Sequence, residues 1–153
     1  MANTYSQMTI QCVFAVKGRE NVITKDFREE LHKYMAGILK GDNIFPLAVG
    51  GWKDHMHILF ELPTSRTVAD IIQNLKSVSS KWINERRLVG GKFNWQNGYG
   101  CFSYTRDQRD YLIKYIQSQE QHHKIKTFEE EYLELLQEFK IEYNPQYLFE
   151  FYK

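Results

Sequence analysis

Residues 54–63 constrain the fold most, because their apolar side chains recur with a period of two. The segment reads DHMHILFELP, and every second residue from Met56 onward is large and apolar. Such alternation predicts a β-strand with one apolar face. The strand directs His55 and His57 to the opposite face, with their Cα atoms about 6.5 Å apart. Two neighbouring imidazoles favour a divalent metal site.

A second cluster of polar residues follows about sixty residues later. Thr105 and Gln108 have the spacing of a capping box, and residues 111–123 then predict a helix of about four turns. Tyr115 and Gln119 are four residues apart, so they lie on adjacent turns of one helix face. A cation held by two imidazoles could take an amide oxygen as a third ligand and keep positions free for a phosphate.

These two clusters resemble a known family of DNA-joining enzymes. His55-Met56-His57 resembles the His-hydrophobic-His signature of the single-tyrosine HUH transposases of small bacterial insertion sequences, which include the transposases associated with repetitive extragenic palindromes. The run YIQSQ at 115–119, followed by His122 and His123, resembles their nucleophile helix. Two further segments resemble the family's first strand with its basic turn and its approach to the tyrosine helix: residues 12–19 and 95–103.

The resemblance implies a chemistry for each residue of the two motifs. Tyr115 would be the nucleophile that cleaves single-stranded DNA and forms a 5′-phosphotyrosine. His55, His57 and Gln119 would hold Mg²⁺ or Mn²⁺, although zinc would also suit the histidines, so the sequence does not fix the metal. The family recognises hairpins formed by imperfect palindromes and works as a homodimer. No organic cofactor is implied.

The predicted elements alternate in the order strand, helix, strand, strand, helix, strand, helix, helix. This order predicts an α+β fold, an antiparallel sheet with helices mainly on one face, which resembles the ferredoxin-like or RRM-like sheet of the HUH family. The other face would carry His55 and His57. The strands are expected at residues 9–16, 45–49, 53–62 and 101–104, and the helices at about 24–39, 67–86, 111–123 and 127–140.

Composition limits the class of protein. The chain has 153 residues, 42% hydrophobic and 25% charged, which suits one globular domain over residues 1–153. No run approaches about 18 apolar residues, so no membrane span is expected. The N-terminus shows no secretion signal. Cys12 and Cys101 are expected to be buried free thiols, in keeping with a reducing cytoplasm.

The charge is unevenly distributed although the net charge is only +1. Residues 64–114 hold nine basic and four acidic residues, a net of +5, whereas residues 115–153 hold four basic and eight acidic residues, a net of −4. A basic middle could form a DNA-binding face, and a solvated helix face is the alternative. The candidate DNA contacts are Lys76, Lys81, Arg86, Arg87, Lys92 and Arg106.

Several residues have two interpretations. His122 could contribute to DNA or metal binding, or lie on the surface, and Asp54 could orient an imidazole or simply begin the strand. Residues 129–131 are consecutive glutamates, expected to favour the positive end of the last helix. The aromatic tail, residues 141–153, is expected to dock on the rest of the chain. Three aromatic residues could stack on unpaired bases, although core packing is expected for at least two of them: Trp95, Tyr99 and Phe102.

Three other functions stay open at this level. A domesticated relative would act on chromosomal palindromes rather than move its own gene. A silent RRM-like module would bind nucleic acid without a metal and form no covalent adduct. A small metal-dependent phosphoesterase would hydrolyse its substrate and tolerate Tyr115→Phe.

Overall fold

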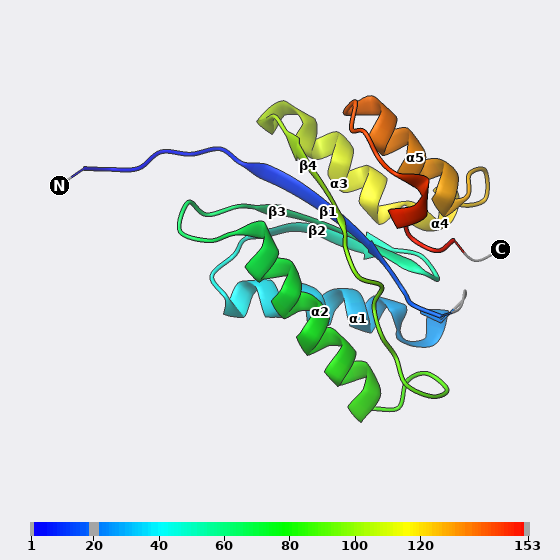
Figure 1. Cartoon of the computed structure of the whole chain (residues 1–153). Helices are drawn as coiled ribbons and strands as arrows, with labels where there is room; N and C mark the ends of the chain where they lie inside the picture. Colours follow the sequence, from blue (N-terminus) through cyan, green and yellow to red (C-terminus); the bar gives the residue numbers. More distant parts are fainter. Residues whose placement is uncertain (1, 19–21, 152–153) are drawn as a thin grey trace.

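The computed structural model describes residues 2–18 and 22–151 and places a four-stranded sheet between two layers of helices (Figure 1). The strands are β1 (Thr9–Ala15), β2 (Pro46–Gly51), β3 (His55–Glu61) and β4 (Gly100–Tyr104). The helices are α1 (Lys25–Gly41), α2 (Val68–Glu85), α3 (Arg109–Gln117), α4 (Gln119–His122) and α5 (Phe128–Glu138). Two short 3-10 turns are η1 (Arg106–Gln108) and η2 (Pro145–Tyr147).

The sheet has the strand order β2-β3-β1-β4, and every neighbouring pair is antiparallel. β1 and β3 are the two central strands, so both faces of β3 are covered and His55 through Phe60 are all buried. The predicted alternation is confirmed. Met56, Ile58 and Phe60 pack with α1 and α2 on one face of the sheet. Leu59 packs with Leu112 and Ile116 of α3 on the other face.

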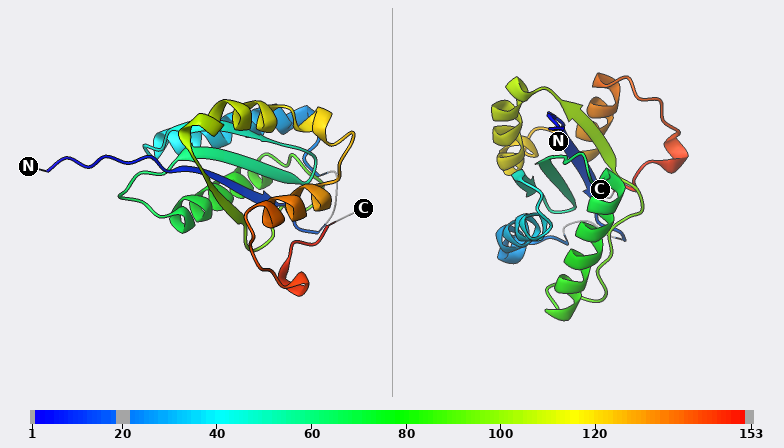
Figure 2. Two further views of the ribbon diagram at one scale, coloured as in Figure 1. Left: turned by 90° about the horizontal axis from the view of Figure 1, so that it is seen from above. Right: turned by 90° about the vertical axis from the view of Figure 1, so that its left-hand side faces the viewer.

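The predicted α+β class with an antiparallel sheet is confirmed. The two longest helices, α1 and α2, lie on one face of the sheet, and α3 and α5 lie on the other (Figures 1 and 2). Their buried side chains recur at helical spacing, for example Phe27, Leu31 and Met35 on α1. The face that carries the histidines is therefore closed by the shorter helices, which the sequence alone did not place there.

The single helix expected over residues 111–123 is divided into α3 and α4. The break is at Ser118, whose φ of −107° and ψ of 27° are not helical. Its hydroxyl donates to the carbonyl of Lys114 at 2.7 Å. The Ser118 N–H donates to the same carbonyl at 3.0 Å, and serines that bond back in this way often bend helices.

The chain's ends and cysteines bear on three further expectations. Phe149 and Phe151 pack on the rings of Phe128 and Tyr132, so the expected docking of the tail is confirmed for these two residues. Tyr143 and Tyr147 are exposed, and Tyr152 and Lys153 lie outside the described residues. Both cysteines are free, but the predicted burial holds only for Cys12, because Cys101 is on an exposed position of β4. Arg19 of the predicted basic turn is outside the described residues. No helix in the described part of the chain is long and apolar enough to cross a membrane.

Candidate metal and tyrosine site

Strand β3 carries two fully buried histidines that point into the space between the sheet, α4 and α5. Their ring centroids are 5.1 Å apart. His55 Nδ1 lies 2.8 Å from the Asp54 carboxylate, and His57 Nδ1 lies 2.8 Å from the side-chain carbonyl of Gln11. The Gln11 amide nitrogen donates to the Tyr104 hydroxyl at 2.7 Å, which turns its carbonyl toward His57. Both Nε2 atoms are therefore directed toward the helices.

Gln119, the third ligand expected from the resemblance, reaches the same cluster from the start of α4. It is 2% exposed, and its Oε1 lies 3.1 Å from His55 Nε2 and 2.8 Å from His123 Nε2. Its amide nitrogen donates to Glu131 Oε2 at 3.1 Å, which fixes the side chain with its oxygen toward the imidazoles. The helix break at Ser118 does not move Gln119 away from the histidines.

Glu131 of α5 is the site residue that the sequence analysis missed. Its Oε1 lies 3.0 Å from His57 Nε2 and 3.3 Å from His55 Nε2, and the side chain is 2% exposed. Potential ligand atoms of His55, His57 and Glu131 all lie within 4.8 Å of one another, a group that could hold a metal ion. The feature of the sequence that could have revealed it is its spacing, because Glu131 falls on the apolar face of α5 with Phe128 and Leu135.

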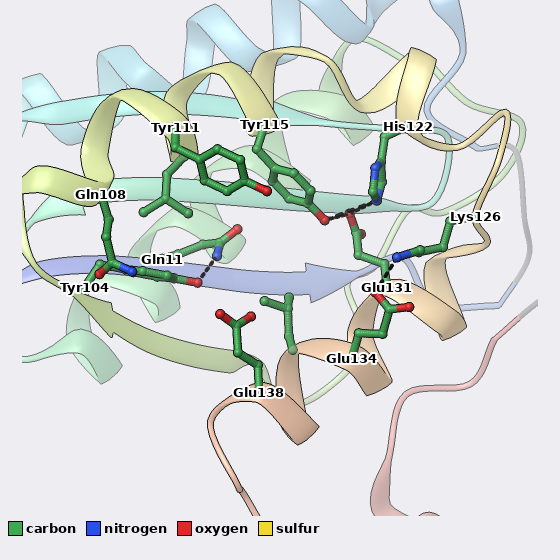
Figure 3. Close-up of a pocket in the computed structure, with 12 residues that line it drawn as sticks. Gln11, Tyr104, Gln108, Tyr111, Tyr115, His122, Lys126, Glu131, Glu134 and Glu138 are labelled. Atoms are coloured by element: carbon green, nitrogen blue, oxygen red, sulfur yellow. Dashed lines mark hydrogen bonds and ion pairs between the residues drawn. The ribbon is translucent and has the colours of Figure 1, made fainter.

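Tyr115 of α3 brings its hydroxyl to this cluster within the same chain (Figure 3). The hydroxyl donates to Glu131 Oε2 and lies 3.3 Å from His122 Nε2. The ring meets that of His57 edge-on, with centroids 5.9 Å apart. Tyr111 is 72% exposed, and its ring lies beside that of Tyr115, with 6.4 Å between centroids. Tyr115 is thus the nucleophile candidate whose oxygen lies beside the imidazoles.

Burial and the Glu131 carboxylate set the electrostatics of the site. Burial lowers the pKa of both imidazoles, but at His55 the hydrogen bonds that the ring donates to Asp54 and Glu131, with the charge of these carboxylates, outweigh burial and raise the pKa to about 9. At His57 burial prevails, and its pKa stays below the usual value. Burial and the charge of Glu131 together raise the pKa of Tyr115 above its ordinary value. The phenol therefore stays protonated near neutral pH unless a positive charge offsets the carboxylate.

A cavity of about 230 Å³ opens beside the Tyr115 hydroxyl, between α3 and α5 (Figure 3). Its walls combine the rings of Tyr104 and Tyr111 with amide groups of Gln11 and Gln108. The α5 side carries three glutamates and a lysine: Glu131, Glu134, Glu138 and Lys126. Flat aromatic faces and hydrogen-bonding groups suit a planar polar ligand.

The basic residues named as candidate DNA contacts lie mostly away from Tyr115. Five of them belong to α2 or the segment after it, on the other face of the sheet: Lys76, Lys81, Arg86, Arg87 and Lys92. Arg106 lies in η1, just before the tyrosine helix. Lys76 Nζ donates to the carbonyls of Gln96 and Gly98, at 2.9 and 2.6 Å. Their DNA-binding role stays a prediction.

The aromatic residues before β4 belong largely to the core, as expected for at least two of them. Trp95 and Phe102 are buried. The Trp95 indole donates to the Ser79 hydroxyl at 3.0 Å. Tyr99 is half-buried, and the ammonium of Lys76 lies 5.8 Å from its ring centroid.

Comparison with known proteins agrees with this architecture. Residues 4–119 match the family model described as "Transposase IS200 like". A crystal structure of a candidate transposase from Deinococcus radiodurans R1 aligns with a TM-score of 0.59 and 18% identity, over 78% of this chain and 96% of that one. A REP-associated tyrosine transposase bound to a REP hairpin aligns with a TM-score of 0.55 and 13% identity, over 76% and 68%. At these identities the two structures show a shared fold. No curated protein matches the chain.

Proposed function

Because the chain belongs to the family of IS200-like transposases, we propose that it cleaves and rejoins single-stranded DNA at the ends of an insertion element through a phosphotyrosine at Tyr115. One observation carries the proposal. The Tyr115 hydroxyl lies against Glu131, whose other carboxylate oxygen lies 3.0 Å from His57. A nucleophile and a group of metal-binding side chains are thereby joined through one carboxylate.

The proposed cleavage is a transesterification in which each group has a defined place. The Tyr115 oxygen attacks the scissile phosphorus, the bond from phosphorus to the 3′-oxygen breaks, and the departing 3′-oxygen takes a proton from water to become a free 3′-hydroxyl. Glu131 Oε2 already accepts the hydrogen of the phenol and is placed to take the proton. The covalent intermediate is a phosphodiester, so attack by a 3′-hydroxyl rejoins a strand without an external energy source.

The donor set of this site fits a divalent cation. Two imidazole nitrogens, the amide oxygen of Gln119 and the Glu131 carboxylate converge on a buried position, and we assign these residues to hold Mg²⁺ or Mn²⁺ in the cell. When bound, a divalent cation polarises the scissile phosphate and offsets the negative charge near the phenol. Asp54 and Gln11 would hold the two imidazoles in position through Nδ1.

The proposed substrate is a hairpin formed by an imperfect palindrome beside the cleaved strand. The REP-associated tyrosine transposase with a similar fold is bound to a REP hairpin, which supports this choice. The cavity beside Tyr115 would receive an unpaired base next to the scissile phosphate. The homodimer and the cytoplasmic location belong to the same proposal. Because Tyr115 meets the histidines of its own chain, a dimer would not be needed to assemble one active site.

The test incubates the protein with single-stranded DNA from its own genomic flanks and Mn²⁺, followed by a denaturing gel. We expect a covalent protein–DNA band that disappears with Tyr115→Phe and with chelator and persists with Tyr111→Phe. A band that persists in Tyr115→Phe would overturn the assignment. Binding without any band would favour a silent binding module, and released products with unchanged turnover in Tyr115→Phe would favour a phosphoesterase.

A further inference from the structure

A third imidazole, that of His123, meets the carboxylate and amide oxygens at the centre of the site. His123 follows α4 and is mostly buried, with its side chain 4% exposed. Its Nε2 lies 2.8 Å from Gln119 Oε1 and 3.5 Å from Glu131 Oε1. Its Nδ1 lies 2.8 Å from the backbone carbonyl of Lys126. The ring also meets that of His55 edge-on, with centroids 4.8 Å apart.

Each of the three rings has an oxygen acceptor at its outer nitrogen, Nδ1. A carbonyl or carboxylate oxygen only accepts, so an Nδ1 bonded to such an oxygen can donate to it. The Lys126 carbonyl is the acceptor for His123. The same holds for the other two rings, whose Nδ1 atoms face the oxygens of Asp54 and Gln11. A ring that donates from Nδ1 leaves its inward-facing Nε2 available to bind a cation.

Five potential ligand atoms thus converge in the interior of the site. They are the three Nε2 atoms, Gln119 Oε1 and Glu131 Oε1, with neighbouring contacts of 2.8 to 3.5 Å. Buried acceptors that face one another repel unless a proton or a cation lies among them. One divalent cation among them would remove this repulsion, and His55, His57 and Glu131 already form a group that could hold a metal ion.

We propose that His123 is a direct ligand of this cation, so that the centre has three imidazoles, one carboxylate and one amide oxygen. The inference deepens the proposed function and rests on its metal dependence. It also narrows the choice of metal, because Mg²⁺ prefers oxygen ligands and imidazole suits transition metals. We therefore expect Mn²⁺ to bind at least tenfold more tightly than Mg²⁺.

The matched comparison is between two adjacent histidines. Titration calorimetry with MnCl₂ would compare the full-length wild type with His123→Ala and His122→Ala. His122 is the control because its Nε2 lies 3.3 Å from Glu131 Oε2, the oxygen outside the converging set. We expect at least tenfold weaker Mn²⁺ binding in His123→Ala and less than threefold change in His122→Ala. Equal loss in the two variants, or none in His123→Ala, would overturn the proposal.

A spectroscopic count of nitrogen ligands separates ligation from misfolding. Pulsed electron paramagnetic resonance of bound Mn²⁺ should show three coupled imidazole nitrogens in the wild type and two in His123→Ala. Two in the wild type would contradict the inference while leaving the proposed transposase reaction intact. Three nitrogens without any covalent DNA adduct would uphold the inference and contradict the proposed function. Failure of the wild type to bind Mn²⁺ would overturn both.

Discussion

Gly50 of β2 lies so close to Ile116 of α3 that a Cβ atom on the glycine would overlap the Ile116 carbonyl oxygen and lie 2.8 Å from its Cγ2. Gly50 is also the partner of His57 in the β2–β3 ladder. The missing side chain therefore lets the tyrosine helix rest directly on the strand next to the histidines. Tyr115 precedes Ile116, so this contact sets the distance between the nucleophile and the proposed metal ligands.

Gly50→Ala is expected to displace α3 and slow adduct formation at least tenfold, because sub-ångström placement controls such reactions. The matched control is Gly37→Ala, where a Cβ meets nothing within 4 Å. Gly37 is inside α1, so this change should stabilise the fold by about 0.5 to 1 kcal/mol. The measurements are the rate of adduct formation and the melting temperature of both variants, which together separate a displaced helix from a loss of stability. Equal adduct rates in the two variants would show that the close approach has no role.

Glu131→Gln keeps the size of the side chain but removes the charge that faces the three imidazoles. A ligand that binds only the folded state stabilises it, by about 2.7 kcal/mol at a hundredfold excess over Kd. Mn²⁺ should therefore raise the melting temperature of the wild type by several degrees and raise that of Glu131→Gln much less. Glu130→Gln, on the exposed side of α5, serves as the control. An unchanged Mn²⁺ response in Glu131→Gln would remove this carboxylate from the ligand set.

His32 predicts a pH dependence that is separate from the metal site. Burial, with the charge of Arg28, lowers the pKa of His32 from 6.5 to about 4, and within the described part of the chain its Nε2 has no hydrogen-bond partner. The folded state thus holds a neutral imidazole that the unfolded chain protonates. The neutral His32 thus contributes of the order of 3 kcal/mol to the free energy of unfolding. This stabilisation is fully present above pH 6.5 and is lost as the pH falls toward 4.

Replacement of His32 by glutamine should flatten the stability profile between pH 7 and pH 4.5. The measurement is denaturant unfolding of both proteins across this range, with EDTA present to exclude metal effects. The difference in free energy of unfolding between wild type and variant should shrink or reverse as the pH falls. Parallel profiles would mean that His32 does not titrate differently in the folded and unfolded states.

Tyr111 is expected to act as a stacking surface for DNA. Its ring is 72% exposed, lines the cavity, and lies nearly parallel to that of Tyr115, with 6.4 Å between centroids. Stacking on one base contributes about 1 to 3 kcal/mol. Tyr111→Ala should therefore weaken binding of single-stranded DNA about tenfold, whereas Tyr111→Phe should bind normally. Tyr147→Ala, an equally exposed tyrosine of the tail, is the control in a fluorescence anisotropy titration.

The sequence was sufficient for the parts of the site that depend on local periodicity. Strand alternation placed His55 and His57 on one face, and the capping pattern at Thr105 marked η1, the turn that leads into the tyrosine helix. Glu131 was missed because a run of three glutamates also suits the positive end of a helix dipole. Only the packing of α5 on the histidine face shows that one of the three points inward.

Other features depend on contacts that no local pattern encodes. The break at Ser118 falls within a helical pattern that otherwise continues, at a residue whose hydroxyl bonds back to the Lys114 carbonyl. The lysines and arginines of α2 are basic in sequence, but the face of the sheet they occupy is fixed by tertiary packing. Lys76 shows this most clearly, because backbone carbonyls of residues about twenty positions away take up its ammonium group.

The most direct test of the account is to locate the covalently attached DNA on the chain. Trypsin cleaves after lysine and arginine, so Tyr111 falls in the peptide of residues 110–114 and Tyr115 in that of residues 115–124. After nuclease digestion of the adduct, tandem mass spectrometry should find a nucleotide 5′-phosphate on Tyr115. A nucleotide on Tyr111, or on any other residue, would contradict the central claim that the Tyr115 oxygen is the nucleophile.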